Sequence, residues 1–377
     1  MTFYCGFDPT ADSLHVGTLV PLMAMAHLHR AGHRPIAVLG GGTAMVGDPS
    51  GKSELRQLIS QDQIQENRRG VEPQIRRFLD SGPEGALVVD NAEWLLSLNY
   101  VEFLRDVGRH FSVNRMLAAE AYKIRLEKGL SFLEFNYQIL QAYDFLVLQR
   151  RYGCTLQIGG DDQWGNILAG ADLIRRLEHR DAFGLTFPLL VTAAGTKMGK
   201  TAAGTVWLSA TRTSPFELFQ YFLNVDDRDV DRFLRLLTFL PLEEISRYAA
   251  LEGAELRDAK RTLAAEVTTL VHGRAEAERA GQAAAAAFGG DASSDLVPTH
   301  GIAASELASG ARIVDVLVAA GLAPSKSAAR RLIEQGGVRL GERKITAIDE
   351  TIASADLRDE GVLLHAGKKH LKRLIPA

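Results

Sequence analysis

The sequence feature that most constrains the fold is an alternation of strand-like and helix-like segments through the first half of the chain. Strand-like runs cover residues 3–6, 35–39, 86–89, 155–158 and 185–191, and helix-like segments lie near 15–31, 60–79, 99–109, 132–151 and 164–178. This alternation predicts a mostly parallel sheet with helices on both faces. In such sheets ligands bind beyond the carboxyl ends of the strands.

Glycine-rich turns follow several of the predicted strands. They are Gly6, residues 40–42, Gly47 with Gly51, and residues 159–160.

The first strand leads through a tight loop into a helix, with the sequence YCGFDPTADSLHVGT at 4–18. A helix N-terminus carries unpaired N–H groups and partial positive charge, so it suits phosphate. Thr10, His15 and Thr18 lie near that end, and the context alone is a weak phosphate signal.

Composition excludes several classes of protein. The formal net charge of -3 excludes a polyelectrolyte binder, and two cysteines argue against a disulfide framework or a metal cluster. No apolar run reaches transmembrane length, so we expect a cytoplasmic protein without a membrane-bound segment. Residues 310–377 hold 12 Lys/Arg against 8 Asp/Glu, which is compatible either with a nucleic-acid surface or with an ordinary solvated one.

The pattern changes to helices near residue 213, where Ser214, Pro215 and Glu217 form the signature of a capped helix start. We predict a Rossmann-like α/β domain at 1–212 and an α-helical domain at 213–285. An Ala/Gly/Ser-rich linker at 286–310 and a small α+β unit at 311–377 complete the prediction.

The stretch GDPSGKS at 47–53 is close to a phosphate-binding P-loop, but Val46 stands where that motif requires glycine. A P-loop NTPase is therefore excluded. A loop with Lys52 and Arg56 can still face a polyphosphate, and a plain turn-rich loop is equally compatible.

Three polar residues share one face of the predicted helix at 132–151. Tyr137, Gln141 and Asp144 are spaced i, i+4, i+7 on an otherwise apolar helix. They predict either a site for a small polar ligand such as an amino acid or a solvent-facing stripe.

Two further glycine-containing stretches carry polar groups. LQIGGDDQWGN at 156–166 could hold sugar hydroxyls or be a tight turn with a capping aspartate. KMGKT at 197–201 has the two lysines of a mobile phosphate-binding loop, although exposed lysine pairs usually only solvate a surface. The histidines lack a metal-ligand pattern, and we predict no protein-built metal site.

Together, these motifs in this order resemble bacterial tyrosyl-tRNA synthetases, which are class I aminoacyl-tRNA synthetases. The resemblance covers nearly the whole chain, including TSPFELFQYF at 213–222 and an S4-like domain at the C-terminus. It implies that residues 1–212 form the catalytic domain and that the S4-like domain at 311–377 binds RNA. It implies that L-tyrosine and ATP form tyrosyl-adenylate and pyrophosphate, and that the tyrosyl group then moves to the 3′ end of tRNA(Tyr). It also implies a homodimer, with Mg²⁺ arriving on ATP.

The resemblance assigns roles residue by residue. The catalytic residues implied are Thr10, His15, Thr18, Lys52, Arg56, Lys197 and Lys200. Those implied for tyrosine are Tyr4, Asp48, Tyr137, Gln141, Asp144 and Gln163. Those implied for ATP are Cys5, Gly6, Asp8, Gly160, Asp162 and Lys200, and those for tRNA are Lys326, Arg330, Arg331, Arg339 and Lys344.

The sequence departs from the family pattern at three places. Thr18 stands where the signature usually has a second histidine, and Gly199 and Thr201 stand where the broader class often has serines. Family members usually carry more chain before the first strand, which leaves two interpretations open: an N-terminal segment is missing, or the chain begins at this strand. A tryptophanyl-type synthetase and a non-catalytic RNA-binding relative are the alternatives; Tyr4 with Asp144 argues against the first, and Asp48 with Lys197 against the second.

Overall fold

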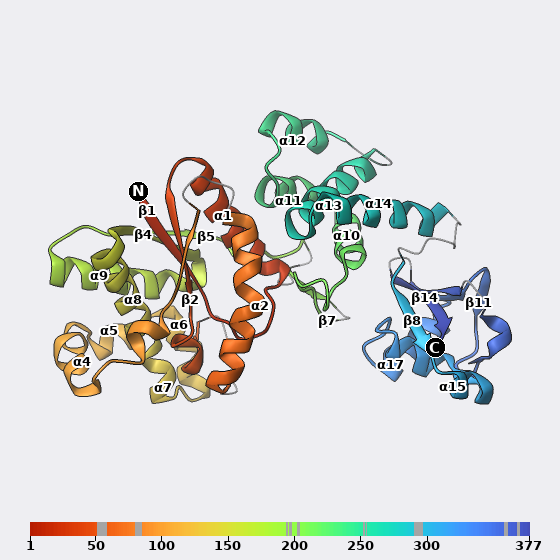
Figure 1. Cartoon of the computed structure of the whole chain (residues 1–377), viewed down its shortest axis with the longest axis horizontal. Coiled ribbons are helices and arrows are strands. Elements are labelled where there is room, and N and C mark those ends of the chain that lie inside the picture. Colours follow the sequence, from red (N-terminus) through yellow and green to blue (C-terminus); the bar gives the residue numbers. More distant parts are fainter. Residues whose placement is uncertain are drawn as a thin grey trace. The chain divides into compact units, whose positions relative to one another are not determined.

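The computed structural model describes residues 1–50, 59–79, 85–193, 195, 198–201, 204–251, 253, 255–289, 297–357, 361–367 and 370–377. The chain divides into two compact units, Met1–Val191 and Thr192–Ala377, and each is considered by itself (Figure 1). The domain boundaries predicted from the sequence stay a prediction.

The first unit is built on a five-stranded sheet in the order β3-β2-β1-β4-β5, with every pair of neighbours parallel. The strands are β1 (Thr2–Phe7), β2 (Arg34–Leu39), β3 (Leu87–Asp90), β4 (Cys154–Gly160) and β5 (Phe183–Phe187). The predicted parallel sheet is therefore confirmed, although the last strand begins and ends earlier than the predicted 185–191.

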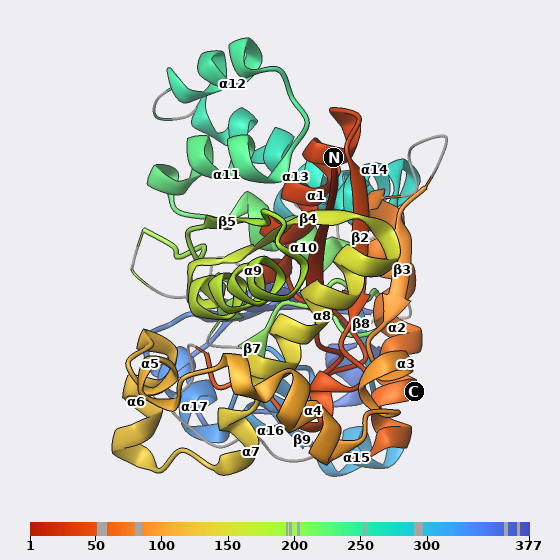
Figure 2. The ribbon, with the colours of Figure 1, turned by 90° about the vertical axis from the view of Figure 1, so that its left-hand side faces the viewer.

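Four long helices cover the two faces of this sheet (Figures 1 and 2). Helices α1 (Leu19–Arg30) and α2 (Gln61–Leu79) lie on one face, and α8 (Tyr137–Tyr152) and α9 (Trp164–Glu178) pack together on the other. The apolar side of α8, including Phe145 and Leu146, is fully buried against the sheet. Gly153 ends α8 in the left-handed conformation with φ 64°, which turns the chain directly into β4.

Short helices fill the stretch between β3 and α8. They are α3 (Ala92–Leu95), α4 (Tyr100–Asp106), α5 (Val113–Leu117), α6 (Glu120–Lys128) and α7 (Phe132–Phe135). The helix predicted at 99–109 is thus shorter, and a separate 3-10 turn at Gly108–His110 follows it. Ser131 and Glu134 form a capping box at the start of α7.

The second unit begins with a two-stranded ribbon of β6 (Lys200–Thr201) and β7 (Gly204–Thr205), and helices follow. These are α10 (Pro215–Leu223), α11 (Val230–Leu237), α12 (Leu242–Ala249), α13 (Leu256–His272) and α14 (Arg274–Gly289). Helix α10 starts with the predicted capping box, in which Ser214 accepts from the Glu217 amide and the Glu217 side chain accepts from the Ser214 amide.

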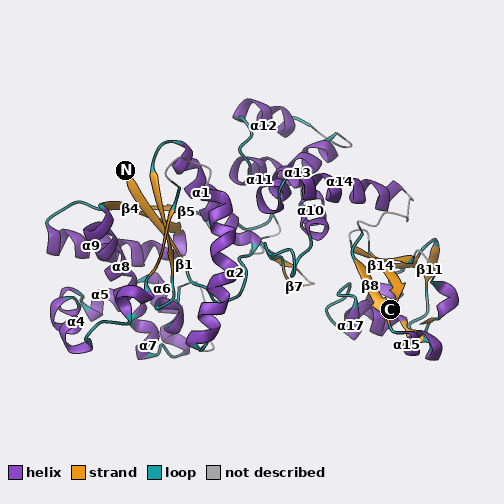
Figure 3. Ribbon diagram, viewed as in Figure 1, coloured by secondary structure: helices purple, strands orange, loops and turns teal. Residues whose placement is uncertain are grey.

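The C-terminal part contains the small α+β fold expected from the sequence (Figure 3). Its sheet runs β11 (Arg343–Ile345), β10 (Val338–Leu340), β13 (Val362–Ala366), β14 (His370–Pro376) and β8 (Thr299–Ile302). The helices are α15 (Ala304–Ser309), α16 (Ile313–Ala319) and α17 (Lys326–Glu334), and β9 (Ala311–Arg312) pairs with β12 (Thr351–Ile352).

One prediction needs correction here. The sequence predicts a linker at 286–310, but β8 and α15 occupy much of that range, and β8 pairs with β14. The sequence does not reveal this strand, because THGI at 299–302 is short and its partner β14 lies more than 65 residues later in the chain.

No helix in the described part of the chain is long and apolar enough to cross a lipid bilayer.

Candidate active site

A pocket of about 340 Å³ lies where β1, β2 and β4 end. Its position agrees with the expectation that parallel sheets bind ligands at their carboxyl edge. Fourteen of the residues implied for catalysis, tyrosine and ATP line it: Tyr4, Cys5, Gly6, Asp8, Thr10, His15, Thr18, Asp48, Tyr137, Gln141, Asp144, Gly160, Asp162 and Gln163. The structure thus brings together residues from both ends of the first unit.

Asp144 lies at the buried end of the pocket, and both of its oxygens are held. Trp94 Nε1 donates to Oδ1 at 2.7 Å, and Asn91 Nδ2 donates to Oδ2 at 2.9 Å. Burial raises the pKa of Asp144 to about 7, although these two hydrogen bonds oppose the rise. A carboxylate fixed in this way can still accept a hydrogen bond from a ligand hydroxyl.

Tyr4 lines the same pocket from β1, and its ring packs edge-on against Phe145 with centroids 5.2 Å apart. Its hydroxyl oxygen is buried and has no hydrogen-bond partner among the described residues. Burial, with a smaller contribution from the charge of Asp144, raises the pKa of Tyr4 well above its ordinary value, so the phenol stays neutral. An orphaned buried hydroxyl is costly unless a ligand satisfies it.

A hydrogen-bonded chain links Asp144 to Asp8 through Thr43. Asn91 Nδ2 donates to Thr43 Oγ1 at 2.9 Å, and Thr43 Oγ1 donates to Asp8 Oδ1 at 2.8 Å. The other oxygen of Asp8 accepts from the Tyr137 hydroxyl at 2.9 Å. Gly40 lies directly beneath this chain, where a Cβ would collide with Asp8 and Thr43.

A second polar group surrounds Asp48. Gln163 Nε2 donates to Asp48 Oδ2 at 2.7 Å, and the backbone amide of Ser50 donates to Oδ1 at 2.9 Å. Buried Asn166 donates to Gln141 Oε1 at 3.0 Å and to Gln163 Oε1 at 3.2 Å. One carboxylate and two amide oxygens thus gather at one side of the pocket, as an ammonium group requires.

His15 caps the short 3-10 turn Val16–Thr18 before α1. Its Nδ1 accepts from the Gly17 amide at 3.0 Å, so a neutral ring carries its proton on Nε2. The Thr18 hydroxyl donates to the His15 carbonyl oxygen at 2.6 Å. Because Thr18 has one hydroxyl proton, this hydrogen bond uses the only donor of its side chain.

The structure describes little of the lysine and arginine residues that were predicted to be catalytic. Lys52, Arg56 and Lys197 lie outside the described residues, as does the side chain of Lys200, whose backbone is in β6. Next to them, the Gly199 amide donates to the Tyr221 hydroxyl at 3.2 Å.

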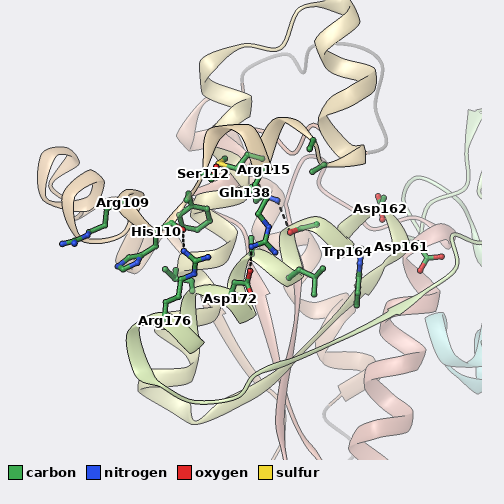
Figure 4. Close-up of a pocket in the computed structure, with 18 residues that line it drawn as sticks. Arg109, His110, Ser112, Arg115, Gln138, Asp161, Asp162, Trp164, Asp172 and Arg176 are labelled. Carbon is green, nitrogen blue, oxygen red and sulfur yellow. Dashed lines mark hydrogen bonds and ion pairs between the residues drawn. The ribbon is translucent and has the colours of Figure 1, made fainter.

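A second pocket, of about 640 Å³, lies on the same unit between α5, α8 and α9 (Figure 4). Arg109, His110 and Arg176 gather at one end, and Trp164, Asp161 and Asp162 lie at the other. Asp162 lines both pockets, so they adjoin at this residue. The Trp164 ring is exposed, at 47% of its surface.

Sequence reasoning missed four residues that hold the first pocket together: Thr43, Asn91, Trp94 and Asn166. Only Asn91 had a usable signal, because it lies two residues after the strand predicted at 86–89. The other three become partners through contacts between distant segments.

The five residues implied for tRNA are all exposed on the C-terminal part. Arg330 and Arg331 lie on α17, and Arg339 on β10 pairs in register with Lys344 on β11. Lys326 Nζ lies 2.7 Å from Asp315 Oδ1. In the described residues no cluster of His, Cys, Asp or Glu could hold a metal ion.

Comparison with known families decides the assignment. The family described as tRNA synthetases class I (W and Y) matches residues 1–289, and the tyrosine–tRNA ligase SYY-like C-terminal domain matches residues 293–373. The chain belongs to the class I tRNA synthetases. Both family matches agree with the fold described above.

Individual relatives agree with this membership. The tyrosine–tRNA ligase of Clostridium tetani is 53% identical over 375 residues, which cover 100% of this chain and 92% of the relative. That of Clostridium botulinum strain Eklund 17B is 54% identical over 374 residues, covering 99% and 92%.

Solved structures show the same fold. A C-terminally truncated mitochondrial tyrosyl-tRNA synthetase from Aspergillus nidulans has a TM-score of 0.67 at 31% identity, covering 76% of this chain and 86% of that one. A tryptophanyl-tRNA synthetase from Encephalitozoon cuniculi, at 12% identity and TM-score 0.55, covers 75% and 79% and shows the fold alone.

Proposed function

We propose that this protein is a tyrosine–tRNA ligase that activates L-tyrosine with ATP and transfers the tyrosyl group to tRNA(Tyr). The observation that carries the choice of amino acid is the buried Tyr4 hydroxyl without a partner, in the same pocket as the fixed Asp144 carboxylate. A substrate phenol accepts from Tyr4 and donates to Asp144, and this satisfies both groups. Phenylalanine leaves both unpaired and is rejected for that reason.

The amino-acid backbone binds at the other side of the pocket. Asp48, Tyr137 and Gln141 hold the α-ammonium, and Gln163 lies near the carboxylate. The Asp48 carboxylate and the Gln141 amide oxygen line the pocket and supply negative potential for the cation. This arrangement leaves the substrate carboxylate free to attack the α-phosphate of ATP.

ATP occupies the part of the pocket lined by Cys5, Gly6, Asp8, Gly160 and Asp162. Burial raises the pKa of Cys5 to about 12, so its thiol is neutral and suits a ribose hydroxyl. The start of α1, with Thr10 and the Nε2–H of His15, faces the phosphates. Thr18 supports His15 through its carbonyl, and Lys52, Arg56, Lys197 and Lys200 neutralise charge that develops on the leaving pyrophosphate.

Magnesium enters on the ATP phosphates, which are its usual ligands together with water.

For the second step, the 3′ end of the tRNA reaches the adenylate through the second pocket. Exposed Trp164 offers a surface on which a base can stack, and Arg109 and Arg176 lie at the far end (Figure 4). The C-terminal part binds the body of the tRNA through Lys326, Arg330, Arg331, Arg339 and Lys344, which are all exposed.

The protein acts in the cytoplasm as a homodimer. Phe132 and Leu133 on α7 are 69% and 42% exposed, and adjacent exposed apolar side chains are typical of subunit interfaces.

The test is ATP–pyrophosphate exchange with purified full-length protein and each of the standard amino acids in turn. We expect exchange with tyrosine alone, and a large rise in the KM for tyrosine in Asp144→Ala. Exchange driven by tryptophan instead of tyrosine would support the tryptophanyl-type alternative. RNA binding by folded protein without any exchange would reject the catalytic proposal.

A further inference from the structure

Asn166, near the start of α9, is 3% exposed and is surrounded by residues of the amino-acid site. Its Nδ2 lies 3.0 Å from Gln141 Oε1, 3.2 Å from Gln163 Oε1 and 3.4 Å from Ser50 Oγ. These partners come from α8, from the turn after β4 and from the loop after β2. A single side-chain amide therefore joins three separate segments behind the pocket wall.

The contacts of Asn166 fix which way two glutamine amides face. A glutamine amide presents an acceptor on one side and two donors on the other, and rotation of the amide exchanges them. Because Asn166 donates to both carbonyl oxygens, each oxygen is held on its side of the amide. The Nε2 of Gln163 is then directed to Asp48 Oδ2, at 2.7 Å.

We propose that Asn166 is a positioning residue for the end of tyrosine that carries the ammonium and carboxylate groups. The inference rests on the proposed function, because it assigns Asp48, Gln141 and Gln163 to that end of the substrate. Without Asn166, rotation of the Gln141 amide brings its NH₂ group toward the ammonium, where donor meets donor. Rotation of Gln163 likewise breaks its hydrogen bond to Asp48.

The effect is confined to one end of the substrate. At the phenol end Asp144 is held by Asn91 and Trp94, which belong to the stretch after β3. The two groups of hydrogen bonds use different side chains, so loss of Asn166 leaves the phenol end in place. A general loss of packing would weaken binding at both ends of the substrate. Weakening at the ammonium end alone therefore distinguishes a positioning role for Asn166.

The experiment compares Asn166→Leu with the unchanged full-length protein in tyrosine-dependent pyrophosphate exchange. Leucine keeps the approximate shape and removes the donors. Two inhibitors each contain only part of tyrosine: p-cresol has the ring and its hydroxyl, and tyramine has the ammonium group as well. We expect the KM for tyrosine and the inhibition constant of tyramine to rise roughly tenfold to a hundredfold, while that of p-cresol stays unchanged.

Two further variants keep the result interpretable. Asn91→Leu is the matched control, in which p-cresol and tyramine should weaken together. If Asn166→Leu does not fold, the smaller change Asn166→Ser, which keeps one donor, should show the same selectivity with a smaller rise.

Equal weakening of p-cresol and tyramine in the Asn166 variants, or no change for tyramine, would overturn the proposal. Absence of tyrosine-dependent exchange in the unchanged protein would instead reject the proposed function, so the two failures are distinguishable.

Discussion

At the scale of single residues, the buried end of the pocket is governed by the ionisation of Asp144. Its carboxyl is removed from water, which raises its pKa to about 7, and Asn91 and Trp94 stabilise the charged form. In the proposed function the ionised form accepts a hydrogen bond from a substrate phenol, whereas protonation removes one acceptor position. The site thus contains a carboxyl group whose pKa lies close to neutral pH.

We expect tyrosine binding to weaken as the pH falls below about 7. The sign follows from the raised pKa: below it Asp144 is protonated, and the phenol loses the acceptor of its hydrogen bond. The measurement is the KM for tyrosine in pyrophosphate exchange across this range. Asp144→Asn should bind tyrosine weakly at every pH, and an unchanged pH profile in that variant would assign the titration to another group.

The residues of this site differ in how far the sequence reveals them. Tyr137, Gln141 and Asp144 are readable because helical spacing alone places them on one face, and all three line the pocket. Thr43, Trp94 and Asn166 are not readable from the sequence, because each forms a hydrogen bond with a residue far away in the chain. Helical and strand periodicity describe only neighbours in sequence.

At the scale of elements, the start of α8 depends on a buried ion pair between α6 and α7. Arg125 and Glu134 have side chains 2% and 6% exposed, with Arg125 Nη2 3.0 Å from Glu134 Oε2. Glu134 also accepts from the amide and hydroxyl of Ser131, and Arg125 donates to the Gly129 carbonyl oxygen. This cluster fixes the turn that leads into α8 and hence the position of Tyr137.

We expect Arg125→Met to lower the free energy of unfolding by about 3 kcal/mol, because Glu134 would remain buried without its partner charge. The measurement is urea unfolding followed by circular dichroism. The double variant Arg125→Met with Glu134→Gln keeps an acceptor for Ser131 and removes the charge, so it should recover most of the loss. A double variant no more stable than the single one would show that the charge is not the cause.

The elements themselves were predictable where the pattern is local. The capping box at Ser214 appears as predicted, as does the alternation of strands and helices in the first unit. Strand β8 was not predictable, because residues 299–302 lack an apolar alternation and are held in place by pairing with β14. A strand defined mainly by its partner leaves little trace in its own residues.

At the scale of the whole molecule, the chemistry and the binding of the tRNA body are assigned in our proposal to different parts of the chain. The pocket proposed for tyrosine and ATP is lined wholly by residues of Met1–Val191. The exposed basic residues proposed for tRNA lie on α17, β10 and β11.

Deletion of residues 290–377 should therefore abolish tRNA charging and spare adenylate formation. The measurements are aminoacylation of tRNA(Tyr) and pyrophosphate exchange on the same preparation. Equal loss of both activities would contradict this division.

The strand order of the first unit also has a consequence for how the protein reaches its folded state. β1 is the central strand, but its neighbour β4 follows only after β2, β3 and the short helices. Pairing such distant segments requires closing a long loop, and this slows folding. Tyr4 therefore lacks its native contacts until β4 and α8 pack against β1. During that interval the unpaired edge of β1 is exposed and can associate with other chains.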